Sequence, residues 1–276
     1  MSAAVQPAAE SQGAEVLYSV ADHIATITLN RPERMNTISG PMLNQLTQHL
    51  VVADRDKDVR VVILTGTGRA FCAGLDLSEA TKTPGSTGIT AGANVSTDLD
   101  LRNTPPTVMF NMGKPTICAL NGSAAGYGMD TALGCDIRIM ADTAKMAAAF
   151  TKRGIVPESG GTWFLPRLIG WSKAAELIFT GRTLTAAECV EMGLASKAVP
   201  AADLAGEARK LALEIAANAP LAVQASKKMM RMGLNETFDD HVHHVFLQLL
   251  PLLRTKDAAE GMLAFMEKRP ADFQGR

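Results

Sequence analysis

Residues 61–77 read Val61-Val62-Ile63-Leu64-Thr65-Gly66-Thr67-Gly68-Arg69-Ala70-Phe71-Cys72-Ala73-Gly74-Leu75-Asp76-Leu77, a β-branched apolar run that leads into a glycine-rich turn. Residues 119–130 show a similar pattern with Ala119-Leu120-Asn121-Gly122-Ser123-Ala124-Ala125-Gly126-Tyr127-Gly128-Met129-Asp130. Small residues ahead of a helix start leave backbone N–H groups unpaired, with the positive end of the helix behind them. Two such donors can polarise a carbonyl group and hold an oxyanion, so this pair of turns indicates a candidate active site.

Neither turn matches a nucleotide-binding motif. The first lacks the Gly-Lys-Ser/Thr ending of a P-loop, and neither has the G-x-G-x-x-G spacing of a dinucleotide turn. Ser123 stands one place too early for the nucleophile elbow of a hydrolase. For either turn alone, the alternative that its glycines only permit a tight strand-to-helix connection stays open. The presence of both turns favours the functional interpretation.

On either side of these turns, short apolar runs alternate with helical patterns. Met42, Leu43, Leu46, Leu50 and Val51 recur at helical spacing after Ser39 and Pro41, which predicts a helix over 42–53. Alternating strands and helices favour an α/β fold with a mostly parallel, layered core. The predicted strands are 16–20 and 23–29, joined as a hairpin, and then 60–64, 116–120, 137–140 and 197–199.

The composition excludes several classes of protein. The chain has 276 residues, 47% of them hydrophobic, and a formal net charge of −1, so it can bury a large core but has no general attraction to nucleic acid or anionic lipid. Its four cysteines form no Cys-x-x-Cys pair, which predicts free thiols in a reducing compartment. No signal peptide and no apolar run of about 18 residues is present, so we expect a cytoplasmic protein without a membrane segment.

Three segments are predicted by composition: a disordered tail over 1–14, a core over 15–200 and a helical region over 201–276. Residues 78–107 are rich in Thr, Gly, Ser, Asn and Pro, which predicts a mobile segment beside a site or a surface excursion. The apolar faces of the helical region must pack on the core or on another subunit. They include Leu211, Ile215, Val245, Phe246, Leu249, Leu250, Leu253, Leu263 and Phe265.

Ordered motifs along nearly the whole chain resemble those of the enoyl-CoA hydratase/isomerase family, the crotonases. Two of them lie in the glycine-rich turns, at 71–77 and in Asn121-Gly122-x3-Gly126-x-Gly128. The others are Arg31-Pro32-Glu33-Arg34-Met35-Asn36, Cys135-Asp136-Ile137-Arg138, Gly154-Ile155-Val156-Pro157-Glu158, Leu165-Pro166-Arg167-Leu168-Ile169-Gly170, Glu260-Gly261, Phe265, Glu267-Lys268-Arg269-Pro270 and Phe273.

The resemblance implies a crotonase-like spiral of ββα units, with a C-terminal helical region that assembles homotrimers or dimers of trimers. It implies an acyl-CoA thioester substrate, no separate cofactor and no metal, and an enolate oxygen held by the backbone N–H groups of Leu75 and Tyr127. The Tyr127 side chain is expected to point away or to narrow the acyl tunnel. Further substrate contacts are expected at Ala73, Gly74, Asp76, Gly126 and Phe150, with Arg34 and Lys268 near the coenzyme A phosphates and adenine or simply on the surface. Asp76 and Asp136 are also expected to fix turns.

The acid and base groups are expected to decide the reaction. Typical hydratases of this family hold one water between two glutamates, and this chain has Asp130 and Phe150 at those two positions. Because phenylalanine transfers no proton, we favour isomerisation of a 3-enoyl-CoA to a 2-enoyl-CoA. The resemblance implies Glu158 as the single base, since some isomerases of the family carry their catalytic glutamate at this position. The alternative is that Glu158 is a carboxylate near the N-terminus of a helix. Asp130 is interpreted as a second acid/base or as a carboxylate that the helix dipole favours. The alternatives are a hydratase with an altered Asp130/Glu158 pair and a non-catalytic protein, either RNA-binding or structural.

Two further clusters are expected to be structural. The spacing of His241, His243 and His244 is not typical of a helical metal site. Met229, Met230 and Met232 are interpreted as core filling.

Overall fold

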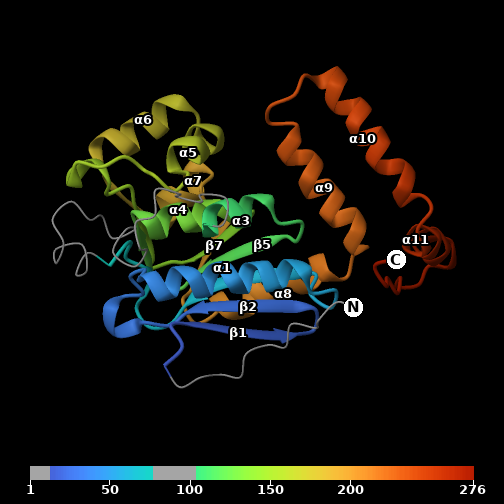
Figure 1. Cartoon of the computed structure of the whole chain (residues 1–276), viewed down its shortest axis with the longest axis horizontal. Helices are drawn as coiled ribbons and strands as arrows, with labels where there is room; N and C mark the ends of the chain where they lie inside the picture. Colours follow the sequence, from blue (N-terminus) through green and yellow to red (C-terminus); the bar gives the residue numbers. More distant parts are fainter. Residues whose placement is uncertain (1–12, 77–103) are drawn as a thin grey trace.

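A computed structural model describes residues 13–76 and 104–276, and Figure 1 shows its arrangement. The main sheet has six strands in the order β1-β2-β3-β5-β7-β10. β1 and β2 form an antiparallel hairpin, and every later pairing in this sheet is parallel. The predicted alternation is therefore confirmed. The strands are β1 (Val16–Ala21), β2 (Ile24–Leu29), β3 (Val61–Gly66), β5 (Thr116–Leu120), β7 (Ile137–Ala141) and β10 (Lys197–Val199).

A second, four-stranded sheet has the order β4-β6-β8-β9. Its strands are β4 (Ala70–Cys72), β6 (Ser123–Ala125), β8 (Lys145–Ala147) and β9 (Thr183–Thr185). β4, β6 and β8 each follow a strand of the main sheet after a short turn, so the chain winds from one sheet to the other and then into a helix. This repeated ββα path is the expected spiral.

Helices follow the strand pairs. In α1 (Gly40–Arg55), the Ser39 side chain caps the first turn by accepting the Met42 N–H at 3.1 Å, and the buried side chains recur at helical spacing, as predicted. α3 (Pro105–Asn111) begins with two prolines, which suit the first turn of a helix. The predicted irregular segment therefore ends before 107. The other elements of the core are η1 (Pro32–Arg34), α4 (Tyr127–Gly134), η3 (Thr151–Arg153), α5 (Gly161–Ile169), α6 (Trp171–Thr180) and α7 (Ala186–Met192).

The helical region divides into two parts. α8 (Leu204–Ala216) packs on β3, β5 and β7, and its Leu211 and Ile215 join the core. The remaining helices stand away from the sheets in Figure 1, with α9 and α10 side by side. They are α9 (Pro220–Met232), α10 (Phe238–Leu252) and α11 (Lys256–Glu267).

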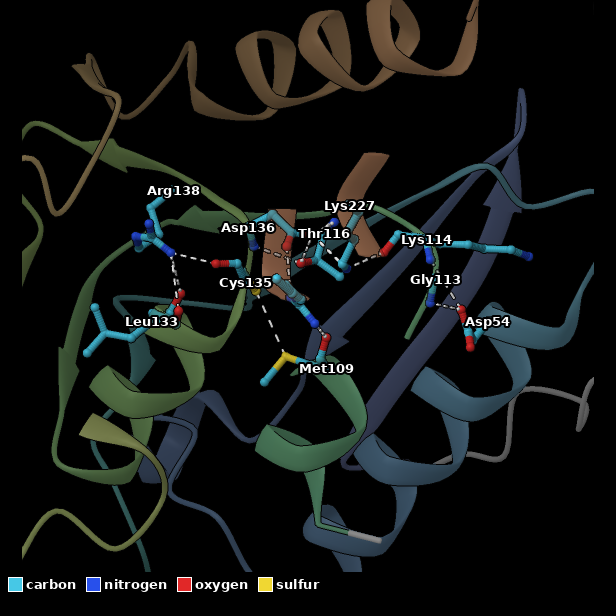
Figure 2. A network of polar contacts seen from close by, with 12 residues as sticks. Asp54, Met109, Gly113, Lys114, Thr116, Leu133, Cys135, Asp136, Arg138 and Lys227 are labelled. Atoms are coloured by element: carbon cyan, nitrogen blue, oxygen red, sulfur yellow. Dashed lines mark hydrogen bonds and ion pairs between the residues drawn. The ribbon is translucent and has the colours of Figure 1, made fainter. Parts of the chain in front are cut away.

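A buried polar network fastens α9 to the end of the main sheet (Figure 2). The Asp136 carboxylate accepts the Thr116 N–H at 2.8 Å and pairs with Lys227 at 2.7 Å and Arg231 at 2.8 Å. Burial acts to raise the pKa of Asp136, but the two cations outweigh it and hold that pKa below its usual value. The expectation that Asp136 fixes structure is confirmed.

Several other expectations can be compared with the structure. All four cysteines are buried and free. The methionine cluster was only partly interpreted correctly, because Met229 is buried whereas Met230 is 74% exposed. Residues 1–12 of the predicted tail and 78–103 of the irregular segment lie outside the described residues. No helix within 13–76 and 104–276 is long and apolar enough to cross a membrane.

Candidate active site

The two glycine-rich turns meet at one edge of the second sheet. β4 and β6 pair in parallel, which brings the residues that follow each strand together. A Cβ on Gly74 would stand 3.0 Å from the Ala125 carbonyl oxygen and 3.9 Å from the Tyr127 nitrogen. Gly74 has φ +104 and Gly126 has φ +54, backbone conformations that favour glycine. The turns approach this closely because Gly74 lacks a side chain, whereas Gly126 is required by its positive φ.

The two expected donors have free N–H groups. Tyr127 is the first residue of α4, so its N–H has no partner within the helix. Leu75 forms a parallel β-bridge with Ile38, but the two hydrogen bonds of this bridge come from its neighbours. The Ile38 N–H donates to Gly74 O at 2.8 Å, and the Asp76 N–H donates to Ile38 O at 3.0 Å. No hydrogen bond from either N–H is found within the two described ranges. A carbonyl oxygen placed between them could accept both.

Two asparagines hold the first turn in shape. Asn36, fully buried, donates to Thr67 O at 2.9 Å and Ala70 O at 2.8 Å. Asn121 accepts the Gly66 N–H at 3.0 Å. These bonds satisfy backbone polar groups of Gly66, Thr67 and Ala70 and so fix the turn that leads to Leu75.

A cavity of about 610 Å³ is lined by Tyr127, whereas Leu75 is not among its lining residues. Glu158 and Tyr127 share its wall, so the structure brings the expected base and one expected donor to the same space. The Glu158 side chain remains accessible to solvent, and partial burial raises the pKa of its carboxyl. The lining residues are Leu43, Thr104, Pro106, Thr107, Phe110, Tyr127, Glu158, Ser159, Gly160, Trp163, Phe164 and Asn235.

Asp130 does not line the cavity but lies behind the lining residue Ser159. Its side chain is fully buried, and its Oδ2 accepts the Ser159 hydroxyl at 2.8 Å and the Gly161 N–H at 3.1 Å. Its Oδ1 has no hydrogen-bond partner among the described residues. Burial raises the pKa of Asp130 to about 7, against the effect of its two donors. Asp130 thus supports the loop that carries Glu158.

Phe150 and Tyr127 occupy different positions relative to the cavity. Phe150 is 3% exposed, and its ring lies 3.9 Å from the point that a Cβ on Gly126 would take, so it packs behind the second turn. Tyr127 is buried and lines the cavity. Of the two expectations for its side chain, the structure favours the one in which it narrows the space.

The remaining expected contacts do not line the cavity. Arg34 is exposed in η1, and Lys268 is exposed at the end of α11. Asp76 pairs with Arg31 at 3.0 Å, which suits its expected role in fixing a turn. Ala73 N–H donates to Met35 O at 3.0 Å. The coenzyme A contacts at Arg34 and Lys268 therefore stay predictions.

Several residues that line the cavity were not predicted from the sequence. Trp163 and Phe164 follow Glu158 by five and six positions, and two adjacent aromatic residues so close to the expected base were a usable signal. Phe110 and Asn235 come from distant segments, and nothing in the sequence places them here. Ser159 is next to Glu158, yet its bond to Asp130 depends on how the two segments pack.

The histidines of α10 hold a carboxylate. Nδ1 of His241 and Nδ1 of His244 each lie 3.0 Å from Glu236. His241 and His244 can reach the same carboxylate because helical residues three apart share a face. Across 13–76 and 104–276, no group of three or more His, Cys, Asp or Glu side chains is arranged to hold a metal ion.

Comparison with known proteins shows the family and the fold of the chain. The sequence model of the enoyl-CoA hydratase/isomerase family matches residues 19–276. The enoyl-CoA hydratase of Bacillus anthracis superposes with a TM-score of 0.85 at 36% identity, covering 95% of this chain and all of that one. The chain belongs to the enoyl-CoA hydratase/isomerase family, and like its relatives it is an enzyme of acyl-CoA chemistry.

Individual relatives carry out different reactions. The 1,2-epoxyphenylacetyl-CoA isomerase of Escherichia coli is 36% identical, covering 95% of this chain and 98% of that relative. The (E)-benzylidenesuccinyl-CoA hydratase of Thauera aromatica is also 36% identical, covering 94% of this chain and 99% of that relative. Because an isomerase and a hydratase have the same sequence identity to this chain, sequence similarity alone does not show which of the two reactions it catalyses.

Proposed function

We propose that this protein moves the double bond of a 3-enoyl-CoA to the 2 position, with Glu158 as the base and the N–H groups of Leu75 and Tyr127 as the oxyanion donors. One observation carries the proposal: Glu158 lines the cavity that Tyr127 also lines, whereas Asp130 is buried behind it. Hydration needs two groups on one water, but isomerisation needs a single base.

The proposed reaction moves one proton and adds no atoms. The Glu158 carboxylate removes a proton from the carbon next to the thioester. The electron pair of that C–H bond passes into the carbonyl group, and the resulting dienolate oxygen accepts the Leu75 and Tyr127 N–H groups. The electrons then return to form the 2,3 double bond, while Glu158 gives its proton to the carbon two positions along. A raised pKa suits Glu158 to both steps, because the protonated acid must form and react near neutral pH.

A second candidate function is hydration by an altered Asp130/Glu158 pair. The observation in its favour is that Asp130 Oδ1 has no partner within the described ranges and that the pKa of Asp130 is about 7, which would let it act as an acid. Against it stands the position of Asp130, which is fully buried and does not line the cavity, and whose Oδ2 is already bonded to Ser159 of the cavity wall and to Gly161.

The proposal extends to substrate contacts and assembly. Ala73, Gly74, Asp76, Gly126 and Phe150 shape the thioester site, and Arg34 and Lys268 contact the coenzyme A part of the substrate. The active assembly is a homotrimer or a dimer of trimers. The exposed apolar side chains of α10 and α11, among them Phe246 and Phe265, support an interface on that side of the molecule.

The test is to incubate the enzyme in parallel with crotonyl-CoA and with a 3-hexenoyl-CoA. We expect conversion of the 3-enoyl thioester at unchanged mass, and no gain of one water's mass from crotonyl-CoA. The variant Glu158→Gln should lower kcat by about 10²–10⁴-fold while KM changes little, because only the proton transfer is lost. Glu191→Gln, on the exposed face of α7, is the matched control. Near-normal turnover by Glu158→Gln, or hydration of crotonyl-CoA by the unchanged enzyme, would contradict this mechanism.

A further inference from the structure

The 610 Å³ cavity beside Glu158, called the acyl cavity below, is rich in aromatic side chains although the chain has few of them. The protein has 9 Phe, 2 Trp and 2 Tyr, which is 5% of its residues. The cavity takes one of the two Trp, one of the two Tyr and two of the Phe, namely Trp163, Tyr127, Phe110 and Phe164. Aliphatic side chains contribute little to this wall, with Leu43 and Pro106 among its members.

Three of these rings form an edge-to-face cluster. The centroids of Phe110 and Trp163 are 5.1 Å apart at an interplanar angle of 82°, and those of Trp163 and Phe164 are 5.1 Å apart at 86°. Phe110 and Phe164 complete the cluster at 6.2 Å and 60°. Each ring is thus held by two others, so the wall is formed before any ligand enters.

Two cations cover the rings from outside. The Arg167 guanidinium lies 4.1 Å from the Trp163 ring centroid, and that of Arg231 lies 4.7 Å from the Phe110 centroid. Arg231 is fixed in turn by Asp136 and by its bond to Met109 O at 3.0 Å. One face of Trp163 and one face of Phe110 are therefore occupied by a cation, and both residues also line the cavity, where their rings can contact a further ring.

The cavity also has the size and polarity for such a group. Small-molecule sites commonly measure about 300–1,000 Å³, and a cavity of about 150 Å³ already holds a benzene ring. At about 610 Å³, this cavity can accommodate a ring, a short linker and the thioester beside Glu158. Glu158 is the one charged residue in its described lining, so the rest of the wall is free to contact an uncharged ring.

We infer that this site prefers acyl-CoA thioesters whose acyl chain ends in an aromatic ring over aliphatic chains of the same carbon skeleton. The inference rests on the proposed function, because it assigns a substrate class to the same acyl cavity. Its physical reason is the ring quadrupole: an aromatic ligand gains edge-to-face contacts with Trp163 and its neighbours, whereas a saturated ring of equal size gains only dispersion and burial.

The test compares two unreactive thioesters, 5-phenylpentanoyl-CoA and 5-cyclohexylpentanoyl-CoA, by isothermal titration calorimetry on the full chain. The two share every carbon and differ in the π system. We expect the phenyl compound to bind about two- to tenfold more tightly, as one or two edge contacts would produce. Equal binding, or tighter binding of the cyclohexyl compound, overturns the inference.

Variants then assign the preference to the cluster. Trp163→Leu should abolish the phenyl preference and leave the affinity for the cyclohexyl compound within about twofold. Trp171→Leu changes the other tryptophan, which is 76% exposed and absent from this cavity, and should keep the preference. Phe164→Leu is the second variant, should Trp163→Leu fail to fold. A phenyl preference that survives in whichever of these two variants folds rejects the assignment.

These measurements separate the inference from the proposed reaction, because saturated thioesters bind without reacting. The matching 3-enoyl compounds, 5-phenylpent-3-enoyl-CoA and 5-cyclohexylpent-3-enoyl-CoA, then test turnover. Tighter phenyl binding with no isomerisation upholds the aromatic site and rejects the isomerase. Isomerisation of both compounds with equal affinity upholds the isomerase and rejects the aromatic site.

Discussion

Asp130 shows how one buried carboxyl group can link catalysis to stability. It stands where typical hydratases carry a glutamate, yet it accepts hydrogen bonds from Ser159 and Gly161, which follow Glu158 by one and three positions. A Cβ on Gly161 would lie 2.3 Å from Asp130 Oδ1, so this position has no room for a larger residue. The role of Asp130 that the geometry favours is to position the base.

The raised pKa of Asp130 predicts a pH-dependent stability. The unfolded chain releases this proton near pH 4, whereas the folded chain keeps it until about pH 7. Between these values the folded state binds the extra proton, so its stability falls as pH rises and then levels above pH 7. Asp130→Asn has no such proton. The free energy of unfolding of the variant, minus that of the unchanged protein, should therefore rise by about 1.4 kcal/mol per pH unit in this window.

Urea unfolding at half-unit pH intervals measures this difference. Asp142→Asn, at an exposed site after β7, serves as the matched control and should give a curve parallel to that of the unchanged protein. A parallel curve for Asp130→Asn as well would mean that Asp130 is ionised in the folded state throughout.

At the scale of elements, α9 depends on a salt bridge with the end of the main sheet. Lys227 is 8% exposed, and Asp136 gives it a carboxylate at 2.7 Å (Figure 2). Arg231 pairs with the same carboxylate and covers the Phe110 ring, so the junction also supports the cavity wall. The helix hairpin that carries Asn235 to the cavity is fastened at this point.

Removing the carboxylate should loosen α9. Asp136→Asn leaves the buried Lys227 ammonium without its counter-charge, and breaking a buried pair in this way costs about 3–5 kcal/mol. We expect the free energy of unfolding to fall by that amount and amide hydrogen exchange in α9 to quicken. Glu176→Gln breaks the exposed pair with Arg182, at 3.6 Å, and should cost less than about 1 kcal/mol. Equal, small effects of both substitutions would contradict the role given to Asp136.

At the scale of the whole molecule, α10 and α11 leave apolar side chains in contact with solvent. Phe246 is 55% exposed, Phe265 is 85% exposed and Met266 is 71% exposed. α8, by contrast, has its apolar face on the main sheet. An apolar surface of this kind is typical of an interface between protein subunits.

Light scattering after size exclusion tests the proposed assembly. The unchanged protein should have a molar mass of three or six times the 29.2 kDa of one chain. Phe265→Asp places a charge in the proposed interface and should shift the population toward the monomer, since an unpaired charge is costly to bury. Val20→Asp, on the exposed side of β1, should leave the mass unchanged. A monomer of the unchanged protein would count against any assembly through α10 and α11.

Local features explain why much of the fold could be predicted. The strand β5 over Thr116–Leu120 and the strand β10 over Lys197–Val199 were predicted with the bounds observed, because each is a short apolar run between breakers. The start of α1 followed from Ser39, whose side chain caps it. For the apolar face of α8 the sequence left open packing on the core or on another subunit, because its apolar spacing is the same as that of helices that stay exposed.

The resemblance to the family made Glu158 a candidate base, and the sequence by itself determined the alternation of strands and helices and the two glycine-rich turns. These depend on neighbouring residues, since backbone conformation and periodicity are local properties. Only the tertiary structure decided that Glu158 lines the cavity while Asp130 lies behind it, and that Phe110 joins Trp163 and Phe164 there. The reason is that burial and contact between residues distant along the chain depend on how the ββα units stack, which no local pattern specifies.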